Sequence, residues 1–268
     1  MRPFSCLFVQ SPICCIMIIF NLMNDPMRTI RIYQEGDYRP GQTLTLSETA
    51  GQHVGLVLRM QPSEQITLFR GDNHEYVATI LSVRKRQVTV HINTDIEVNR
   101  ESPRIIHLAQ AMSKGDRMDW IIQKAVELGV SSITPLITAH CVVRLDAERL
   151  SKKQSQWQAI AISACEQSGR NRVPIIHVTC SLDAYLNQCQ AKHKWVLYPD
   201  AGKSWRDYVN SPGDMALLIG PEGGLSDDEI SQAMTKQFQP LGLGSRILRT
   251  ETAAITAMSI LQAVYGDI

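Results

Sequence analysis

Two short glycine-bearing segments late in the chain have residue types and spacings that suit ligand binding. The first, IGPEGGLSDDEI (219–230), follows an apolar run and leads into a helix start, because Ser226 and Glu229 have the spacing of a capping box. Strand, glycine turn and helix in this order form the layout that holds a nucleotide phosphate. The loop lacks the lysine and the Ser/Thr of a phosphate-binding loop, however, and Glu222 places a carboxylate where a phosphate would lie. A triphosphate is therefore disfavoured, and a plain strand-to-helix turn stays open.

The second segment, LGLGSRILRTETAAITAM (241–258), also ends a predicted strand with glycines, and Thr250 is expected to cap the helix that follows. Ligands of open α/β sheets lie outside the carboxyl ends of the strands. Two such loops therefore indicate one ligand held between them, largely by backbone groups. Taken alone, Arg246 and Arg249 are equally well explained as surface charges, and Glu251 as a first-turn carboxylate that the helix dipole stabilises.

The composition excludes several classes of protein. Lys and Arg number 27 against 26 Asp and Glu in 268 residues, so a nucleic-acid surface must be a local patch. The seven cysteines form no CxxC pair and have no histidine at zinc-finger spacing, so no structural metal is expected. Reduced thiols in a cytoplasmic protein are the simplest interpretation.

The first 26 residues form an apolar segment that differs from the rest of the chain. Pro12 and Gln10 interrupt it, and it has neither a signal-peptide cleavage site nor a comfortable membrane-spanning length. We expect residues 1–26 to lie outside the folded protein, with translation starting at Met27 as the hypothesis. No membrane partner is expected.

The remaining chain divides into two parts with different periodicity. Residues 27–98 hold short alternating runs typical of strands in a small barrel or sandwich, namely MRTIRIY, TLTLSE, QITLFRG, EYVATILSV and QVTVHIN. From residue 103 onward, strands alternate with helices, which predicts an α/β domain with a mainly parallel sheet over 103–268. We place the boundary within 98–104.

The second part contains several element boundaries that the sequence specifies. Ser113 is expected to cap a helix that runs from residue 114 or 115 to 128 and stops at Gly129. A later helix is expected over 152–169. Strands are predicted at 104–112, 132–137, 173–178, 194–198, 215–219 and 238–244, and further helices at 182–191, from 227, and at 251–265.

Together, LLIGPEGGLSDDEI and LGSRILRTETA resemble the SPOUT superfamily of trefoil-knotted RNA methyltransferases. More narrowly, the chain resembles the bacterial family that methylates N3 of one uridine in 16S ribosomal RNA (RsmE). Further matching pieces are HVGLVLRM, LFRGDNHEYVATI, KGDRMDWIIQKAVELGV and ACEQSGRNRVP, so the resemblance covers residues 28–268. The segment 138–146 departs from the Ser/Arg-rich pattern of the family.

The resemblance implies a PUA-like β-barrel that helps to bind RNA, followed by a SPOUT methyltransferase domain with a deep knot. The knot loops would bind S-adenosylmethionine, with Tyr198-Pro199 as a third wall, and the family acts as a homodimer. The segment 166–170 (EQSGR) is expected near RNA or the interface. The cofactor-binding residues that it implies are Leu218, Gly220, Pro221, Glu222, Gly223, Leu243, Gly244, Ile247, Leu248 and Thr250.

The implied chemistry requires the uracil N3 proton to leave before nitrogen attacks the methyl carbon. We expect Glu251 as the general base and Arg249 as the group that stabilises charge on a uracil oxygen. The partner would be 16S rRNA or the small ribosomal subunit. Candidate RNA-binding residues are Arg28, Arg31, Arg39, Arg84, Lys85, Arg86, Lys114, Arg117, Arg170 and Arg172.

Three alternatives stay open at this point. Ribose 2′-O methylation is the runner-up chemistry, since many knotted relatives perform it. A non-catalytic RNA-binding protein is disfavoured by two intact loops, and a nucleotide-phosphate enzyme by the missing lysine.

Overall fold

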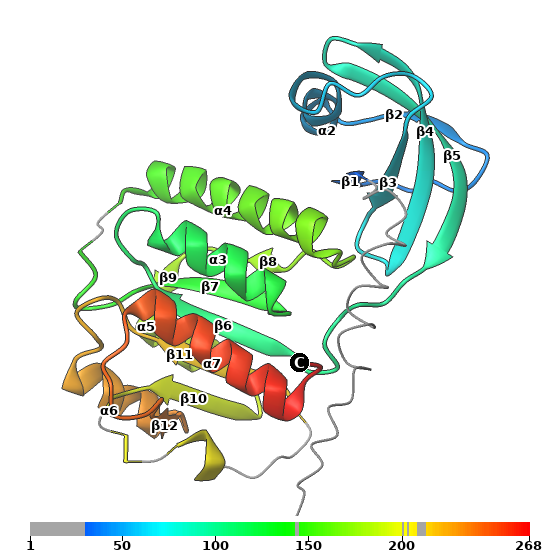
Figure 1. The fold of residues 1–268 in the computed structure, drawn as a ribbon. Helices are drawn as coiled ribbons and strands as arrows, with labels where there is room; N and C mark the ends of the chain where they lie inside the picture. The colour runs from blue at the N-terminus through cyan, green and yellow to red at the C-terminus, as the bar shows by residue number, and fades with distance from the viewer. Residues whose placement is uncertain (1–29, 143–144, 200, 203, 208–212) are drawn as a thin grey trace, which may run out of the picture.

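The structure is a computed structural model that describes residues 30–142, 145–199, 201–202, 204–207 and 213–268 (Figure 1). The expectation for residues 1–26 and the candidate Arg28 lie outside the described residues.

A mixed sheet forms the N-terminal part of the described chain. Its strands are β1 (Ile30–Tyr33), β2 (Thr43–Thr45), β3 (Gln65–Phe69), β4 (His74–Arg84) and β5 (Gln87–Glu97). They lie in the order β1-β3-β4-β5-β2, with β1 parallel to β3 and the other pairs antiparallel. The predicted strands are therefore confirmed. Side chains with alternating burial fill one core, including Ile66, Ile80 and Val90.

A short helix that the sequence did not predict covers the β4–β5 turn. It consists of α2 (Glu48–Gln52), which Ser47 caps, and the π-helical turn η1 (His53–Val57). A β-carbon on Gly51 would lie 2.2 Å from the carbonyl oxygen of Arg86, so glycine is needed for this close approach. The segment formed by α2 and η1 is too short to show a helical periodicity that could be detected in the sequence.

The C-terminal part is built on a sheet whose strands are all parallel. They are β6 (Ile106–Ala111), β7 (Ser132–Ile137), β8 (Ile175–Ile176), β9 (Cys180–Ser181), β10 (His193–Leu197), β11 (Met215–Ile219) and β12 (Gln239–Leu241). The order is β12-β10-β11-β6-β7-β8, with β9 also paired to β7. The α/β prediction is confirmed, and the order places β11, β10 and β12 side by side. The knot stays a prediction.

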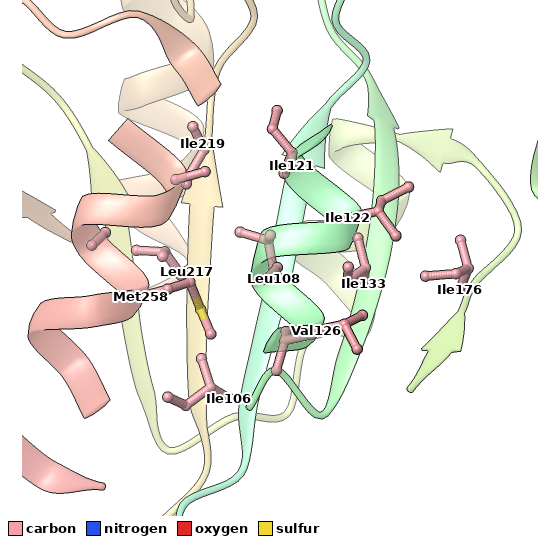
Figure 2. Close-up of a cluster of buried hydrophobic side chains, with 14 of the residues drawn as sticks. Ile106, Leu108, Ile121, Ile122, Val126, Ile133, Ile176, Leu217, Ile219 and Met258 are labelled. Carbon is pink, nitrogen blue, oxygen red and sulfur yellow. The ribbon is translucent and has the colours of Figure 1, made fainter. Parts of the chain in front are cut away.

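Helices cover both faces of this sheet. One face carries α3 (Arg117–Glu127), α4 (Ala147–Ser168) and α7 (Thr250–Tyr265), and the other carries α5 (Leu182–Gln188) and α6 (Asp227–Thr235) (Figure 1). A 3₁₀ turn, η2 (Trp205–Asp207), lies between β10 and β11. Figure 2 shows Ile121 and Ile122 of α3 and Met258 of α7 against strand residues such as Leu108 and Leu217. Burial of these apolar side chains fixes both helices on the sheet.

Two predicted helix caps were wrong, and in both cases the side chain is used elsewhere. The helix expected from Ser113 begins at Arg117, and the Ser113 hydroxyl lies 3.5 Å from the carbonyl oxygen of Ala111. Thr250 is the first residue of α7 rather than its cap, because its hydroxyl bonds a neighbouring loop. The predicted stop at Gly129 and the Ser226–Glu229 capping box are confirmed.

Candidate functional site

A cavity of about 640 Å³ lies at the carboxyl ends of β10, β11 and β12. Its walls come from residues 197–199, from 219–225 and from residues within 241–253. These strands are parallel neighbours, so the loops that follow them meet at one edge of the sheet. The structure therefore brings the two predicted glycine loops and the Tyr198-Pro199 wall into one site.

All the predicted cofactor residues except Leu218 line this cavity, as do the catalytic candidates Arg249 and Glu251. The Leu218 side chain is fully buried in the core on the α5–α6 face of the sheet. It belongs to β11, where every residue is buried, and thus supports the loop from below.

A buried hydrogen-bond chain joins the two glycine loops. The Thr250 hydroxyl donates to the carbonyl oxygen of Gly220 over 2.7 Å, and the Gln110 amide donates to the same hydroxyl over 3.0 Å. A β-carbon on Gly220 would lie 2.9 Å from the backbone nitrogen of Leu225, so the first turn of the loop requires glycine. The ends of β6 and β11 and the start of α7 are thereby fixed together.

The Glu222 carboxylate is held by the segment that precedes α3. It accepts the Lys114 backbone N–H over 2.9 Å and a guanidinium hydrogen bond from Arg117 over 2.5 Å. Partial burial alone would raise the pKa of Glu222, but these two donors lower it below its usual range. Glu222 is therefore ionised at neutral pH and anchors the 220–224 loop.

Arg117 also lies close to the second carboxylate of the cavity. Its Nε is 3.8 Å from Oε1 of Glu251, in the first turn of α7. The other oxygen, Oε2 of Glu251, is buried and has no hydrogen-bond partner among the described residues. A buried acceptor without a partner is costly, so Glu251 is available to a donor brought by a ligand.

His140 is a site residue that the sequence did not reveal. Its Nδ1 lies 3.1 Å from each of the carbonyl oxygens of Gly223 and Gly224, so it carries the proton and donates to them. The neighbouring Ala139 N–H donates to Glu229 Oε1 over 2.7 Å. The sequence showed only that segment 138–146 departs from the family pattern. That departure did not predict the contact between His140 and the glycine loop.

Arg249 differs from the other charged groups of the site. It is exposed, and its side chain has no hydrogen bond or ion pair with the residues that the structure describes. Ile247 beside it is 88% exposed although it lines the cavity. Arg249 and Ile247 can therefore contact a second ligand, beside the one in the cavity, without first breaking an interaction with the described residues.

Most of the RNA candidates lie on the surface. Arg84, Lys85 and Arg86 are exposed at the β4–β5 turn, where Arg86 pairs with Glu48 over 3.1 Å. Lys114 and Arg172 are also exposed, and Arg39 has 80% of its side chain exposed.

Arg31 and Arg170 were expected to bind RNA, but both side chains form ion pairs within the protein. The Arg170 side chain is 7% exposed, pairs with Glu101 over 2.5 Å, and donates to the carbonyl oxygens of Val126 and Val130. The Arg31 side chain is 13% exposed and pairs with Glu75. All three nitrogens of the Arg170 guanidinium are bonded inside the protein. In Arg31 both Nη atoms are bonded and Nε is buried, so neither side chain offers a phosphate free donors at the surface.

Two kinds of feature are absent from the described residues. Within these ranges no group of His, Cys, Asp and Glu could hold a metal ion. None of the helices there combines the length and apolar character needed to cross a bilayer.

Comparisons with known proteins place the chain in one family. Residues 100–262 match the RNA methyltransferase domain and residues 46–93 the RNA methyltransferase PUA domain. A Buchnera aphidicola protein, ribosomal RNA small subunit methyltransferase E, is 36% identical, with 90% of this chain and 98% of that one covered.

Two solved structures are similar over nearly their whole length. One, described as a methyltransferase from Legionella pneumophila in complex with SAM, is 56% identical with a TM-score of 0.89, covering 90% of this chain and 100% of that one. The other, ribosomal RNA small subunit methyltransferase E from Neisseria gonorrhoeae bound to S-adenosylmethionine, is 37% identical with a TM-score of 0.84, covering 90% and 99%.

Proposed function

Because this chain belongs to the family of ribosomal RNA small subunit methyltransferases E, we propose that it methylates N3 of a uridine in 16S rRNA, with S-adenosylmethionine as methyl donor. The observation that carries the proposal is the cavity between the two glycine loops, with the unpartnered Oε2 of Glu251 buried at its side.

The cavity fits S-adenosylmethionine in size and chemistry. Its volume of about 640 Å³ is within the usual range for small-molecule sites. Carbonyl and N–H groups of the two loops suit an adenine edge, and the apolar side chains Leu197, Leu243 and Leu248 suit its faces. Glu222 and Glu251 place carboxylates in the lining for the sulfonium cation, and the glycine loop lacks the lysine that a triphosphate site uses.

The cofactor supplies a methyl group on a sulfonium sulfur. Glu251 is the group we propose to accept the N3 proton of uracil, since its Oε2 has no donor among the residues that the structure describes. Proton removal leaves a nitrogen lone pair that attacks the methyl carbon as the carbon–sulfur bond breaks.

Arg249 is the group we propose to stabilise the uracil anion. Its exposed guanidinium is free of internal partners among the described residues and lies one helical position before Thr250. A charge-assisted hydrogen bond to a uracil oxygen would strengthen as negative charge develops there.

RNA binding is assigned to both parts of the chain. We propose that residues 27–98 form the PUA-like barrel and 103–268 the SPOUT domain, with the knot that the family resemblance implies. The exposed Arg84, Lys85 and Arg86 of the barrel, together with Lys114 and Arg172, would contact phosphates of 16S rRNA, either naked or in the assembled subunit.

A homodimer is part of the proposal. Ala254 and Ala257, the small residues of α7, pack inside this chain and so do not argue for a partner. The neighbouring helices α3 and α7 instead expose Trp120 and Val264, at 43% and 37%. Sedimentation equilibrium that gives only a monomer at micromolar concentration would exclude the dimer.

Calorimetry with S-adenosylmethionine and with ATP tests the proposal. Heat of binding is expected with S-adenosylmethionine alone. Gly223→Asp should abolish this heat, because a β-carbon at residue 223 would lie 3.1 Å from the β-carbon of His140 and displace the loop. The fold of this variant should stay intact. Absence of heat with S-adenosylmethionine would overturn the proposal in favour of a non-catalytic RNA-binding protein, and heat with ATP would favour a nucleotide enzyme.

A further inference from the structure

The first strand of the N-terminal sheet lies against the C-terminal end of α4. The Tyr33 backbone N–H donates to Oε1 of Glu166 over 3.0 Å. Nη2 of Arg31 donates to the carbonyl oxygen of Arg170 over 3.1 Å and to Oδ1 of Asn171 over 2.6 Å. The segment EQSGRN (166–171) therefore binds β1 directly. We call these contacts the interdomain clasp.

A partly buried ion-pair network and an aromatic ring complete the clasp. Glu75 accepts hydrogen bonds from both Arg31 and Arg100, and Arg100 also donates to the carbonyl oxygen of Gly169 over 3.0 Å. The Arg31 guanidinium lies 4.8 Å from the centre of the Phe69 ring. Phe69 belongs to β3 but is fully buried in the core of the methyltransferase domain. Buried ion pairs tolerate little misalignment, so these contacts define one relative orientation.

The link between the two parts is held at the same place. Nδ2 of Asn171 donates to the carbonyl oxygen of Val98 over 2.7 Å. Arg170 pairs with Glu101, three residues further along the link. The connection is therefore tied to the end of α4 rather than free to act as a flexible tether.

The other end of α4 leads to the cavity. The helix has 22 residues and so spans about 33 Å. The chain enters it from β7 through the segment that contains Ala139 and His140, which bond Glu229 and the carbonyl oxygens of Gly223 and Gly224. Figure 1 shows α4 running along the sheet, with β1 beyond its C-terminal end. Helix α4 thus runs between the end of the sheet that carries the 139–140 contacts and the N-terminal sheet.

We propose that α4 and the interdomain clasp act as a fixed spacer between the RNA-binding sheet and the methyl-transfer site. RNA held by Arg84, Lys85 and Arg86 would then present one particular nucleotide to Glu251. Arg31 and Asn171 are the positioning residues of this spacer, and neither contacts the cavity. The proposal rests on the proposed function and adds how the enzyme selects a single site in a long RNA.

The test compares Arg31→Ala and Asn171→Ala with the full-length wild type. Arg149→Ala is the matched control, because Arg149 lies on α4 with its side chain 71% exposed and 3.5 Å from Asp146. Asn171→Ala leaves the Arg31–Glu75 pair in place and so retains that stabilising contact. The measurements are the Kd for S-adenosylmethionine, kcat and KM on small ribosomal subunits, and hydrogen exchange in the peptide that contains Tyr33. Assays run well below each variant's unfolding temperature.

Loss of the clasp should raise KM for the subunit about tenfold or more while Kd for S-adenosylmethionine changes by no more than about twofold. Exchange of the Tyr33 peptide should become faster, and the control should match the wild type in every measurement. Arg31→Lys should not restore KM, since an ammonium lacks the fork that reaches Glu75 and Asn171 together.

If KM for the subunit stays unchanged while hydrogen exchange in the Tyr33 peptide becomes faster, the spacer proposal is overturned. The clasp would then be a stabilising contact only. Lost cofactor binding in either variant would also overturn it, because the effect would then act through the pocket. A wild type that transfers no methyl group to the subunit would instead defeat the proposed function, so the two failures are distinguishable.

Discussion

The Arg117 guanidinium donates a 2.5 Å hydrogen bond to the carboxylate of Glu222, and so joins the first turn of α3 to the glycine loop after β11. The two residues are 105 positions apart in the chain. The same guanidinium lies 3.8 Å from Glu251, so one cation sits between the carboxylates of both cavity loops. This contact determines where Glu222 and Glu251 can lie relative to a bound ligand.

Arg117→Ala should weaken the binding of S-adenosylmethionine. Without the guanidinium, the 220–224 loop loses an anchor and the pKa of Glu222 rises toward its usual range. The Kd should rise roughly tenfold, the scale of one charge-assisted hydrogen bond at a partly exposed site. Calorimetry measures it, and Lys124→Ala is the control, since Lys124 on the same helix pairs with Glu127. An unchanged Kd would show that Glu222 needs no anchor.

Glu251→Gln should remove the proposed base while preserving the shape of the cavity. We expect kcat to fall by about 10²- to 10⁴-fold, the usual contribution of a general base. The Kd for S-adenosylmethionine should stay within a few-fold of the wild type. The rate on rRNA is measured across the pH range, and the loss should be present throughout. Full activity across the pH range would rule out Glu251 as the base.

His140→Ala should weaken cofactor binding several-fold, because the carbonyl oxygens of Gly223 and Gly224 lose their donor. His140→Asn should retain most of the affinity, since a side-chain amide can donate from a similar position. Equilibrium binding at neutral pH measures both variants. If the asparagine variant is as weak as the alanine variant, the effect comes from packing and not from the hydrogen bond.

The lowered pKa of Glu75 predicts that the free energy of unfolding depends on pH. Burial alone would raise the pKa of Glu75, but the guanidiniums of Arg100 and Arg31 lower it below its usual range. A lowered pKa in the folded state means that the ionised carboxylate stabilises the fold above the unfolded pKa, and that this contribution is lost as pH falls through the folded pKa.

Urea unfolding should therefore show a larger loss of stability for the wild type than for Glu75→Gln between about pH 6 and about pH 3. Equal losses in the two proteins would mean that the Arg31 and Arg100 contacts do not stabilise the ionised form. Glu97→Gln is a suitable control, because Glu97 is exposed in β5 of the same sheet.

Local signals in the sequence were enough to predict most elements of the fold. Alternating apolar residues marked β3, β4 and β5, and the Ser226–Glu229 box fixed the start of α6. The general rule that ligands lie at the carboxyl ends of parallel strands predicted that both glycine loops would meet at one edge of the sheet. Thr250 was placed in the site correctly, although its hydroxyl joins two loops instead of capping a helix.

The contacts that the sequence did not reveal join residues far apart in the chain. Arg31 and Arg170 carry the same charge as surface arginines, and nothing local distinguishes a guanidinium that is buried in an ion pair. His140 bonds a loop 83 and 84 residues away. Such pairs depend on strand order, which periodicity does not contain.

The central claim is methyl transfer to a uracil base, and mass spectrometry of rRNA after reaction with the wild-type protein tests it most directly. Small-subunit RNA from cells that lack this activity is incubated with the protein and isotopically labelled S-adenosylmethionine, then digested to nucleosides. We expect one labelled methyl group on N3 of a single uridine, and a yield lower by about 10²-fold or more when Glu251→Gln replaces the wild type under initial-rate conditions. A methyl group on a ribose 2′-oxygen, or no labelled nucleoside at all, would contradict it.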